Sequence, residues 1–347
     1  MLITSSSGVW LQTADGRQIL DAGGGAIVTN IGHGRPEIAQ VASHALERLD
    51  YVVPVFATEA RVALAEEVSD NWLPDPSWRS VFVSGGSESV DAAIRVAQLH
   101  HVACGRSERH KVIGRDVSYH GATLGALSAG LHDRRRKGLE QALLSMPKTS
   151  HYDAEELEKV IELEGPDTIS AFIGEPVIGA AAGAYVPPDD YWPRISEICA
   201  RHDILVIADE VMTGFGRLGT PMGHEALQFT PDIIAAGKGL GGGYVPIGGV
   251  YCRSEVVAPI AETDLALMFY TFAGHDLCCA VAKKVLEIVR AENLIDRAKI
   301  MGEILRERLE QEFQNHPNVE EVRGRGLLQG LGLVANRDTG EPFPRSA

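Results

Sequence analysis

The stretch ILVIADEV at residues 204–211 decides the fold of this chain, because it places two carboxylates directly after five apolar residues. A short apolar run of this kind is typical of a strand that is buried on both faces, as strands of parallel sheets are. A carboxylate at the end of such a strand is costly without a partner, so we expect Asp209 to face a cation, a metal or a protonated heterocycle. The stretch predicts an α/β protein with a polar site at this strand end.

Further short apolar runs lie on both sides of this stretch in the sequence. They cover residues 81–83, 111–114, 169–173, 233–236 and 247–251. Apolar residues between the runs recur at helical spacing, and they are Val90, Ala93, Ile94 and Ala97 in one segment and Leu277, Val281, Val285 and Ile288 in another. This alternation predicts a mostly parallel sheet with helices on both faces.

The sequence changes character after about residue 290. We expect a charged helix over residues 291–314, followed over 319–334 by strands with glycine-rich turns. We interpret 51–290 as the large domain, and we expect 1–50 and 291–347 to contribute to a smaller α+β domain. A domain that begins with one helix and one hairpin has little core of its own, so we expect the small domain to be incomplete in this sequence.

Composition and charge exclude several classes of protein. Hydrophobic residues make up 45% of the 347 residues, but no apolar run approaches the roughly 20 residues of a membrane-spanning helix. The net charge of −15 argues against binding to nucleic acid or anionic membranes, so a small-molecule substrate is expected. The five cysteines contain no C-x-x-C pair and indicate neither a disulfide framework nor a metal site. The first residues lack the features of a signal peptide, so we expect a cytoplasmic protein.

Two more segments follow strands of the predicted sheet. SGGSE at residues 84–88 opens a helix, where its glycines, the Ser87 hydroxyl and the helix N-terminus would bind a phosphate. GKG at residues 237–239 places Lys238 where burial would lower its pKa and favour its use as a nucleophile. Plainer interpretations remain open: Ser87 could cap the helix, Asp209 could form a buried ion pair or bind magnesium, and Lys238 could be a solvated surface charge.

One ligand explains these three segments together. The carboxyl ends of parallel strands meet at one edge of a sheet, so the phosphate cradle, Asp209 and Lys238 are expected to converge. Pyridoxal phosphate needs an anchor for its phosphate, a carboxylate that keeps its pyridine nitrogen protonated, and an amine for its aldehyde. We therefore expect this cofactor.

At these residues the sequence resembles the class III aminotransferases, the omega-amino-acid and amine transaminases among the fold type I pyridoxal-phosphate enzymes. The resemblance runs over nearly the whole chain. Its motifs are GVW at 8–10, DGR at 15–17, NIGHG at 30–34, SGGSE at 84–88, SYHG at 118–121, EPV at 175–177, DEVMTGFGR at 209–217 and TFAGH at 271–275. The separation of 29 residues between Asp209 and Lys238 is also that of the family.

The resemblance implies roles for the site residues. Lys238 would form a Schiff base with the cofactor and later move a proton, while Asp209 would keep the pyridine nitrogen protonated. The implied cofactor contacts are Gly86 and Ser87 at the phosphate, Val211 and Tyr119 on the two ring faces, His120 beside them, and Thr271 from the neighbouring subunit. The resemblance thus implies a homodimer or a dimer of dimers. It assigns Glu175 and Arg217 supporting roles.

The implied reaction moves an amino group from an amine or omega-amino acid to a 2-oxo acid by a ping-pong mechanism through Lys238. Met212 stands where several ornithine and 4-aminobutyrate relatives have Gln, and Ala180 stands where they have a second Glu. Pyruvate is therefore the expected acceptor. An aminomutase or a decarboxylase would use the same Lys238 and Asp209, and a shortened relative could bind the cofactor without turnover.

Overall fold

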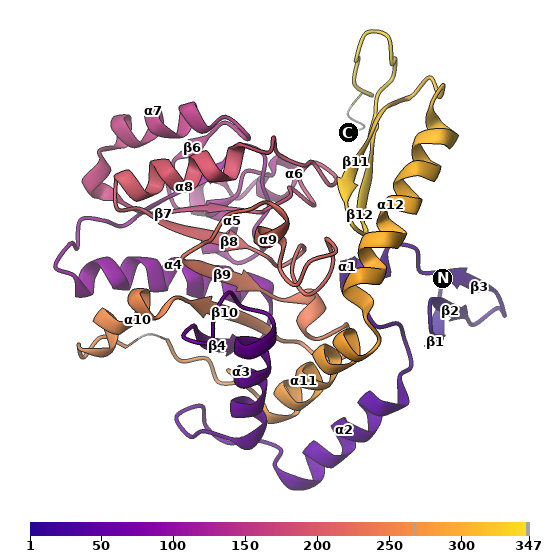
Figure 1. Cartoon of the computed structure of the whole chain (residues 1–347), viewed down its shortest axis with the longest axis horizontal. Coiled ribbons are helices and arrows are strands. Elements are labelled where there is room, and N and C mark those ends of the chain that lie inside the picture. The colour runs from indigo at the N-terminus through magenta and orange to yellow at the C-terminus, as the bar shows by residue number, and fades with distance from the viewer. Residues whose placement is uncertain (267, 345–347) are drawn as a thin grey trace.

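A seven-stranded sheet forms the centre of the molecule. The computed structural model describes residues 1–266 and 268–344, and the strand order of this sheet is β4-β10-β9-β8-β7-β5-β6 (Figure 1). The strand β10 runs antiparallel to both of its neighbours, and the other six strands share one direction. The predicted α/β fold with a mostly parallel sheet is confirmed.

The strands lie within two residues of the predicted apolar runs. They are β4 (Arg79–Val83), β5 (Lys111–Arg115), β6 (Lys148–Thr149), β7 (Ile169–Gly174), β8 (Leu205–Asp209), β9 (Ile233–Ala236) and β10 (Gly248–Cys252). Only β6 was not predicted, because two residues are too few for an apolar pattern. Along β8, Ile207 belongs to one hydrophobic core while Val206 and Ala208 belong to the other, so both faces of this strand are buried.

Helices cover each face of the sheet. One face packs against α4 (Gly86–Ala103), α5 (Leu124–Ala129) and α10 (Ser254–Ala261). The other packs against α3 (Glu59–Asn71), α7 (Ala154–Glu164), α8 (Tyr191–Arg201) and α11 (Asp276–Ala291). The predicted apolar stripe of α4 is buried against the sheet, as the helical spacing of Val90, Ala93, Ile94 and Ala97 requires.

The first 48 residues form smaller elements beside this body. A three-stranded antiparallel sheet consists of β1 (Ile3–Ser7), β2 (Trp10–Thr13) and β3 (Gln18–Leu20), and it is followed by α1 (Gly24–Ile27) and α2 (Pro36–Arg48). Short elements in later loops are α6 (Asp133–Arg136), α9 (Gly223–Ala226) and the 3-10 turns η1 (Glu140–Ala142), η2 (Pro166–Thr168) and η3 (Lys238–Leu240).

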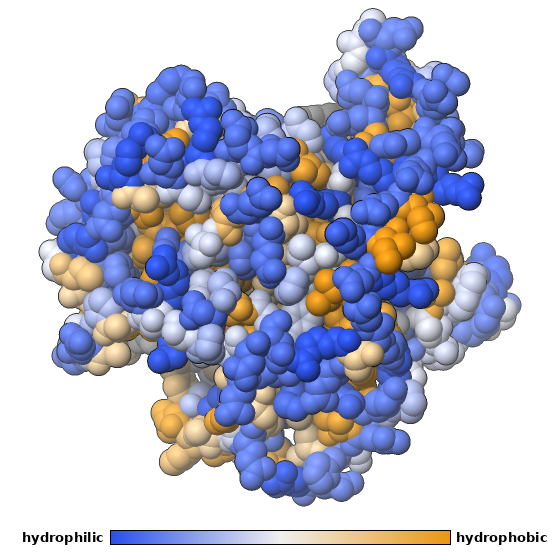
Figure 2. Space-filling model, in the orientation of Figure 1, coloured by the Kyte–Doolittle hydropathy of each residue, from blue (hydrophilic) through white to orange (hydrophobic). Residues whose placement is uncertain are grey.

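The last elements project from the body (Figure 1). They are α12 (Leu294–Phe313) and a hairpin of β11 (Val319–Arg325) and β12 (Leu328–Leu333). The helix begins three residues later than predicted, because Asn293 has a left-handed backbone with φ of 53° that separates α12 from α11. Hydrophobic residues are visible on the surface along α12 (Figure 2), where Ile300 and Ile304 are exposed. The proposed domain boundaries at residues 50 and 290 stay a prediction.

Within the two described ranges of the chain, no helix is long and apolar enough to cross a membrane.

Candidate active site

Four charged residues lie at the carboxyl ends of four neighbouring parallel strands. Arg115 ends β5, Glu175 directly follows β7, Asp209 ends β8, and Lys238 follows β9 after one glycine. Because β5, β7, β8 and β9 are adjacent in the sheet, these residues form a row along one edge. This edge is where ligands bind in open parallel sheets.

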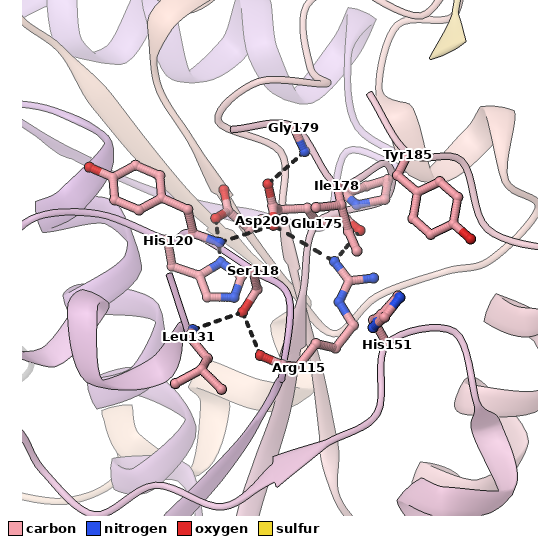
Figure 3. A network of polar contacts seen from close by, with 12 residues as sticks. Arg115, Ser118, His120, Leu131, His151, Glu175, Ile178, Gly179, Tyr185 and Asp209 are labelled. Carbon is pink, nitrogen blue, oxygen red and sulfur yellow. Dashed lines mark hydrogen bonds and ion pairs between the residues drawn. The ribbon is translucent and has the colours of Figure 1, made fainter. Parts of the chain in front are cut away.

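Asp209 has a buried partner. The residue is 2% exposed, and its Oδ2 atom lies 2.6 Å from Nδ1 of His120 (Figure 3). Its other oxygen accepts a hydrogen bond from the backbone N–H of Val211 at 3.1 Å. The Nε2 atom of His120 is buried and has no hydrogen-bond partner among the described residues. The predicted cost of burying Asp209 is therefore offset by an imidazole and a backbone amide.

Glu175 connects the residue before His120 to the loop that follows β7. Its two carboxylate oxygens accept hydrogen bonds from the backbone N–H groups of Gly179 at 3.0 Å and Tyr119 at 3.3 Å. Burial raises the pKa of Glu175, whereas the charges of His120 and Arg115 act to lower it. Glu175 thus fixes the position of Tyr119, next to the pair of His120 and Asp209.

Arg115 supports Glu175 from inside the protein. Its side chain is fully buried, and its Nη2 atom lies 3.9 Å from a carboxylate oxygen of Glu175 (Figure 3). The guanidinium carbon lies 5.4 Å from the ring centre of Tyr152 and 5.7 Å from that of Trp192. Sequence reasoning missed this residue, although an arginine that closes an apolar strand was the available signal.

Lys238 lies partly buried in the turn η3. Burial lowers the pKa of its ammonium group, while the charges of Asp209 and Glu175 act to raise it and that of Arg135 lowers it further. A lowered pKa makes the neutral, nucleophilic amine available at lower pH than for an exposed lysine. The interpretation of Lys238 as a solvated surface charge is therefore not supported.

The glycine-rich segment opens α4 without a side-chain cap. Gly85 is the N-cap residue, and Ser87 lies within the first turn, where its Oγ atom accepts a hydrogen bond from the backbone N–H of Ala122 at 3.0 Å. The alternative that Ser87 caps the helix is therefore wrong. A Cβ atom on Gly86 would lie 2.8 Å from a methyl group of Val211, so glycine is needed for this close approach.

These residues fit pyridoxal phosphate. The uncapped end of the long helix α4 offers backbone N–H groups and a partial positive charge to a phosphate. Val211 packs beside this end, and Asp209 and Lys238 follow neighbouring strands, where they would supply the required carboxylate and amine. The unpartnered Nε2 atom of His120 is a buried polar atom that needs a partner. Thr271 lies in an exposed loop, and its contribution to a neighbouring subunit stays a prediction.

Comparisons with known proteins find similar aminotransferases over nearly the whole chain. The putrescine–pyruvate aminotransferase of Pseudomonas aeruginosa is 35% identical, with 99% of this chain and 79% of that protein covered. Gamma aminobutyrate transaminase 3 of Solanum lycopersicum is 33% identical, with 99% and 70% covered. The structure of an (S)-enantioselective omega-transaminase from Thermomicrobium roseum matches with a TM-score of 0.95 and 36% identity, with 99% and 80% covered.

The family that the motifs predict is therefore confirmed. Since the model of the aminotransferase class-III family matches residues 1–345, and relatives of more than 30% identity cover nearly all of the chain, this protein belongs to the class-III aminotransferases, which use pyridoxal phosphate.

Proposed function

We propose that this aminotransferase moves an amino group from an amine or omega-amino acid to pyruvate. The observation that carries the choice of acceptor is the apolar contact between two loops, one after β7 and one after β8. Ala180 is exposed. Gly179, the residue before it, packs against Met212 so closely that a Cβ atom on Gly179 would collide with the Met212 sulfur. The side chains at these two positions carry no amide or carboxylate. They therefore cannot form the polar contacts that would accommodate the second carboxylate of a substrate such as 2-oxoglutarate.

The proposed chemistry assigns one task to each residue of the row. When bound, pyridoxal phosphate supplies an aldehyde and an electron-accepting ring. Lys238 acts as the nucleophile and then moves the proton to and from the substrate carbon. Asp209, held by His120, keeps a proton on the pyridine nitrogen. Backbone N–H groups of Gly86 and Ser87 bind the phosphate.

The ring faces and the acceptor carboxylate need further contacts. We assign Val211 and Tyr119 to the two faces of the pyridine ring. The guanidinium carbon of Arg135 lies 4.5 Å from the ring centre of Tyr119, and its charge contributes to the lowered pKa of Lys238. We expect Arg135 to attract the carboxylate of the 2-oxo acid to this side of the site.

A homodimer is also part of the proposal. Thr271 lies between Phe269 and Phe272, which are 61% and 58% exposed. The ring of Phe272 packs 5.9 Å from that of Tyr51, and Phe56 is exposed as well. Exposed aromatic residues in such number are typical of a protein interface. Thr271 would then reach the phosphate in the partner's site.

Two experiments test the function. Borohydride reduction of the cofactor-loaded protein, followed by peptide mass spectrometry, should find a pyridoxyl group on Lys238 and none on the partly buried Lys148. Protein loaded with pyridoxamine phosphate should then react faster with pyruvate than with 2-oxoglutarate in a single turnover. The double variant Ala180→Glu, Met212→Gln should lower the ratio of the rate with pyruvate to the rate with 2-oxoglutarate.

Each experiment has an outcome that contradicts the proposal. A protein that takes up no pyridoxal phosphate would refute the assigned site. A strong preference for 2-oxoglutarate would refute pyruvate as the acceptor. Isomerised or decarboxylated products without net transfer of the amino group would favour an aminomutase or a decarboxylase.

A further inference from the structure

The backbone at Lys238 has an unusual conformation. Its φ angle is +40°, in the left-handed region that residues with a side chain rarely adopt. A non-glycine residue keeps such a conformation only when its surroundings hold it there. The contacts of the turn that contains Lys238 therefore decide where its amine points.

A side chain from the N-terminal segment holds this turn. The Nδ2 atom of Asn30 donates a hydrogen bond of 3.0 Å to the carbonyl oxygen of Gly239, the residue after Lys238, across 209 positions of sequence. The same carbonyl also accepts a longer bond of 3.3 Å from the backbone N–H of Gly242, and the backbone N–H of Gly241 is directed to it as well. Asn30 thus provides the side-chain bond that fixes the peptide between Gly239 and Leu240, one peptide beyond Lys238.

Two glycines make room for the Asn30 amide. A Cβ atom on Gly239 would lie 3.2 Å from Nδ2 of Asn30, and one on Gly242 would lie 3.2 Å from its Oδ1 atom. That oxygen is buried and has no hydrogen-bond partner within the described part of the chain. The amide is therefore enclosed by the loop, and its one hydrogen bond is directed to the turn.

A second contact anchors the same two segments farther from Lys238. The hydroxyl of Tyr244 donates a hydrogen bond to the carbonyl of Gly32 at 2.7 Å and accepts one from the N–H of Arg35 at 3.0 Å. Arg35 in turn binds the carboxylate of Glu292 through two hydrogen bonds of 2.6 and 2.7 Å. The segment that carries Asn30 is thus itself fixed to the end of α11.

We propose that Asn30 is a positioning residue for Lys238. By holding the carbonyl of Gly239, it maintains the left-handed backbone and directs the amine toward the site. Without this bond the turn would relax, and the amine would lose its fixed orientation toward the cofactor aldehyde. The distance between the Lys238 amine and the negative charges of Asp209 and Glu175 would also change. The inference rests on the proposed role of Lys238 as the nucleophile.

The test compares Asn30→Ala with Tyr244→Phe in the full chain. Tyr244→Phe removes the hydroxyl's bonds to Gly32 and Arg35 but leaves the bond between Asn30 and Gly239 intact. Stopped-flow absorbance gives the rate at which the cofactor-free protein captures pyridoxal phosphate. A pH titration of the visible absorption of the loaded protein gives a midpoint that reports on the Lys238 environment. Thermal unfolding of both variants measures loss of stability alone.

We expect Asn30→Ala to slow capture about tenfold, equivalent to about 1.4 kcal/mol, and to shift the pH midpoint. Tyr244→Phe should leave the capture rate within about twofold of that of the parent protein and should not shift the pH midpoint. Asn30→Asp, which keeps the shape but loses the donor above the pKa of its carboxyl, should slow capture as Asn30→Ala does. If Asn30→Ala does not fold, Asn30→Asp takes its place in the test.

Two results would overturn the inference. One is a parental capture rate and midpoint in both Asn30 variants, whatever their melting temperatures. The other is equal slowing in Tyr244→Phe, which would indicate general loosening of the loop. Borohydride labelling separates these results from a failure of the proposed function. A label on a residue other than Lys238 refutes the role of Lys238 as the nucleophile. If the label is on Lys238, the two results above refute the role of Asn30 alone.

Discussion

The buried guanidinium of Arg115 donates a hydrogen bond of 2.7 Å to the carbonyl oxygen of Glu175, and the carboxylate of the same glutamate lies 3.9 Å away. Both side chains are almost completely shielded from water. A buried charge that loses its partner is strongly destabilising, whereas removal of both charges costs much less. The pair supports the site because Glu175 accepts a hydrogen bond from the backbone N–H of Tyr119. A double-mutant cycle measures the contribution of the pair to stability.

Arg115→Met should lower the free energy of unfolding by about 3 kcal/mol, because Glu175 would remain buried without its cation. Urea unfolding of the cofactor-free protein measures this change. The double variant Arg115→Met, Glu175→Gln should recover a large part of the loss. Equal losses in the single and double variants would show that the packing of Arg115 against Tyr152 and Trp192 matters more than its charge.

Gly86→Ala should weaken binding of pyridoxal phosphate, since the new methyl group would lie 2.8 Å from Val211 and displace it. We expect at least about a tenfold rise in the dissociation constant, equivalent to about 1.4 kcal/mol. The neighbouring Gly85→Ala is a matched control, because a Cβ atom there has no neighbour within 4 Å. Equal affinities for the two variants, measured by absorbance titration, would contradict the assignment of Val211 to the cofactor.

Asp209→Asn should reduce turnover by about 100-fold or more, because a neutral amide cannot stabilise a protonated pyridine nitrogen. Binding of the cofactor should be affected much less. The control is Asp232→Asn, since Asp232 is a largely buried carboxylate that accepts a hydrogen bond from Val206 away from the row of strand ends. Turnover near the parental value in Asp209→Asn would show that another group performs this task.

Much of this architecture is predictable from the sequence. The apolar runs locate six strands, because a strand buried on both faces leaves a continuous apolar pattern. The prediction that Asp209 and the glycine-rich segment approach one cofactor follows from the shared edge of parallel strands. The side chain of Val211 indeed packs on Gly86. These inferences depend on where the strands end in the sequence and on the expectation that most of them run parallel.

Other features depend on contacts that no local pattern contains. The antiparallel direction of β10 follows from the path of the loop after Lys238, and apolar periodicity is the same for both directions. The hydrogen bond between Asn30 and Gly239 joins residues 209 positions apart. The role of Arg115 becomes visible only when Glu175 is placed directly after the neighbouring strand β7.

Stability at mildly acidic pH should depend on His101. This residue is fully buried near the end of α4, where its Nε2 atom lies 3.0 Å from the carbonyl oxygen of Ser170. Burial lowers its pKa from 6.5 to about 4. Between these two pH values the unfolded chain binds a proton at this position and the folded chain does not, so stability falls as the pH falls from 6.5 toward 4.

This linkage corresponds to about 2 kcal/mol of stability lost between pH 7 and pH 5. His101→Gln keeps a donor for Ser170 but cannot be protonated, so it should remove that part of the pH dependence. Urea unfolding at pH 7 and at pH 5 measures the free energy of unfolding, with the exposed His44→Gln as a matched control substitution. If His101→Gln loses as much stability between the two pH values as the parent protein, then other groups cause the acid sensitivity, and His101 is protonated in the folded state at higher pH than its burial indicates.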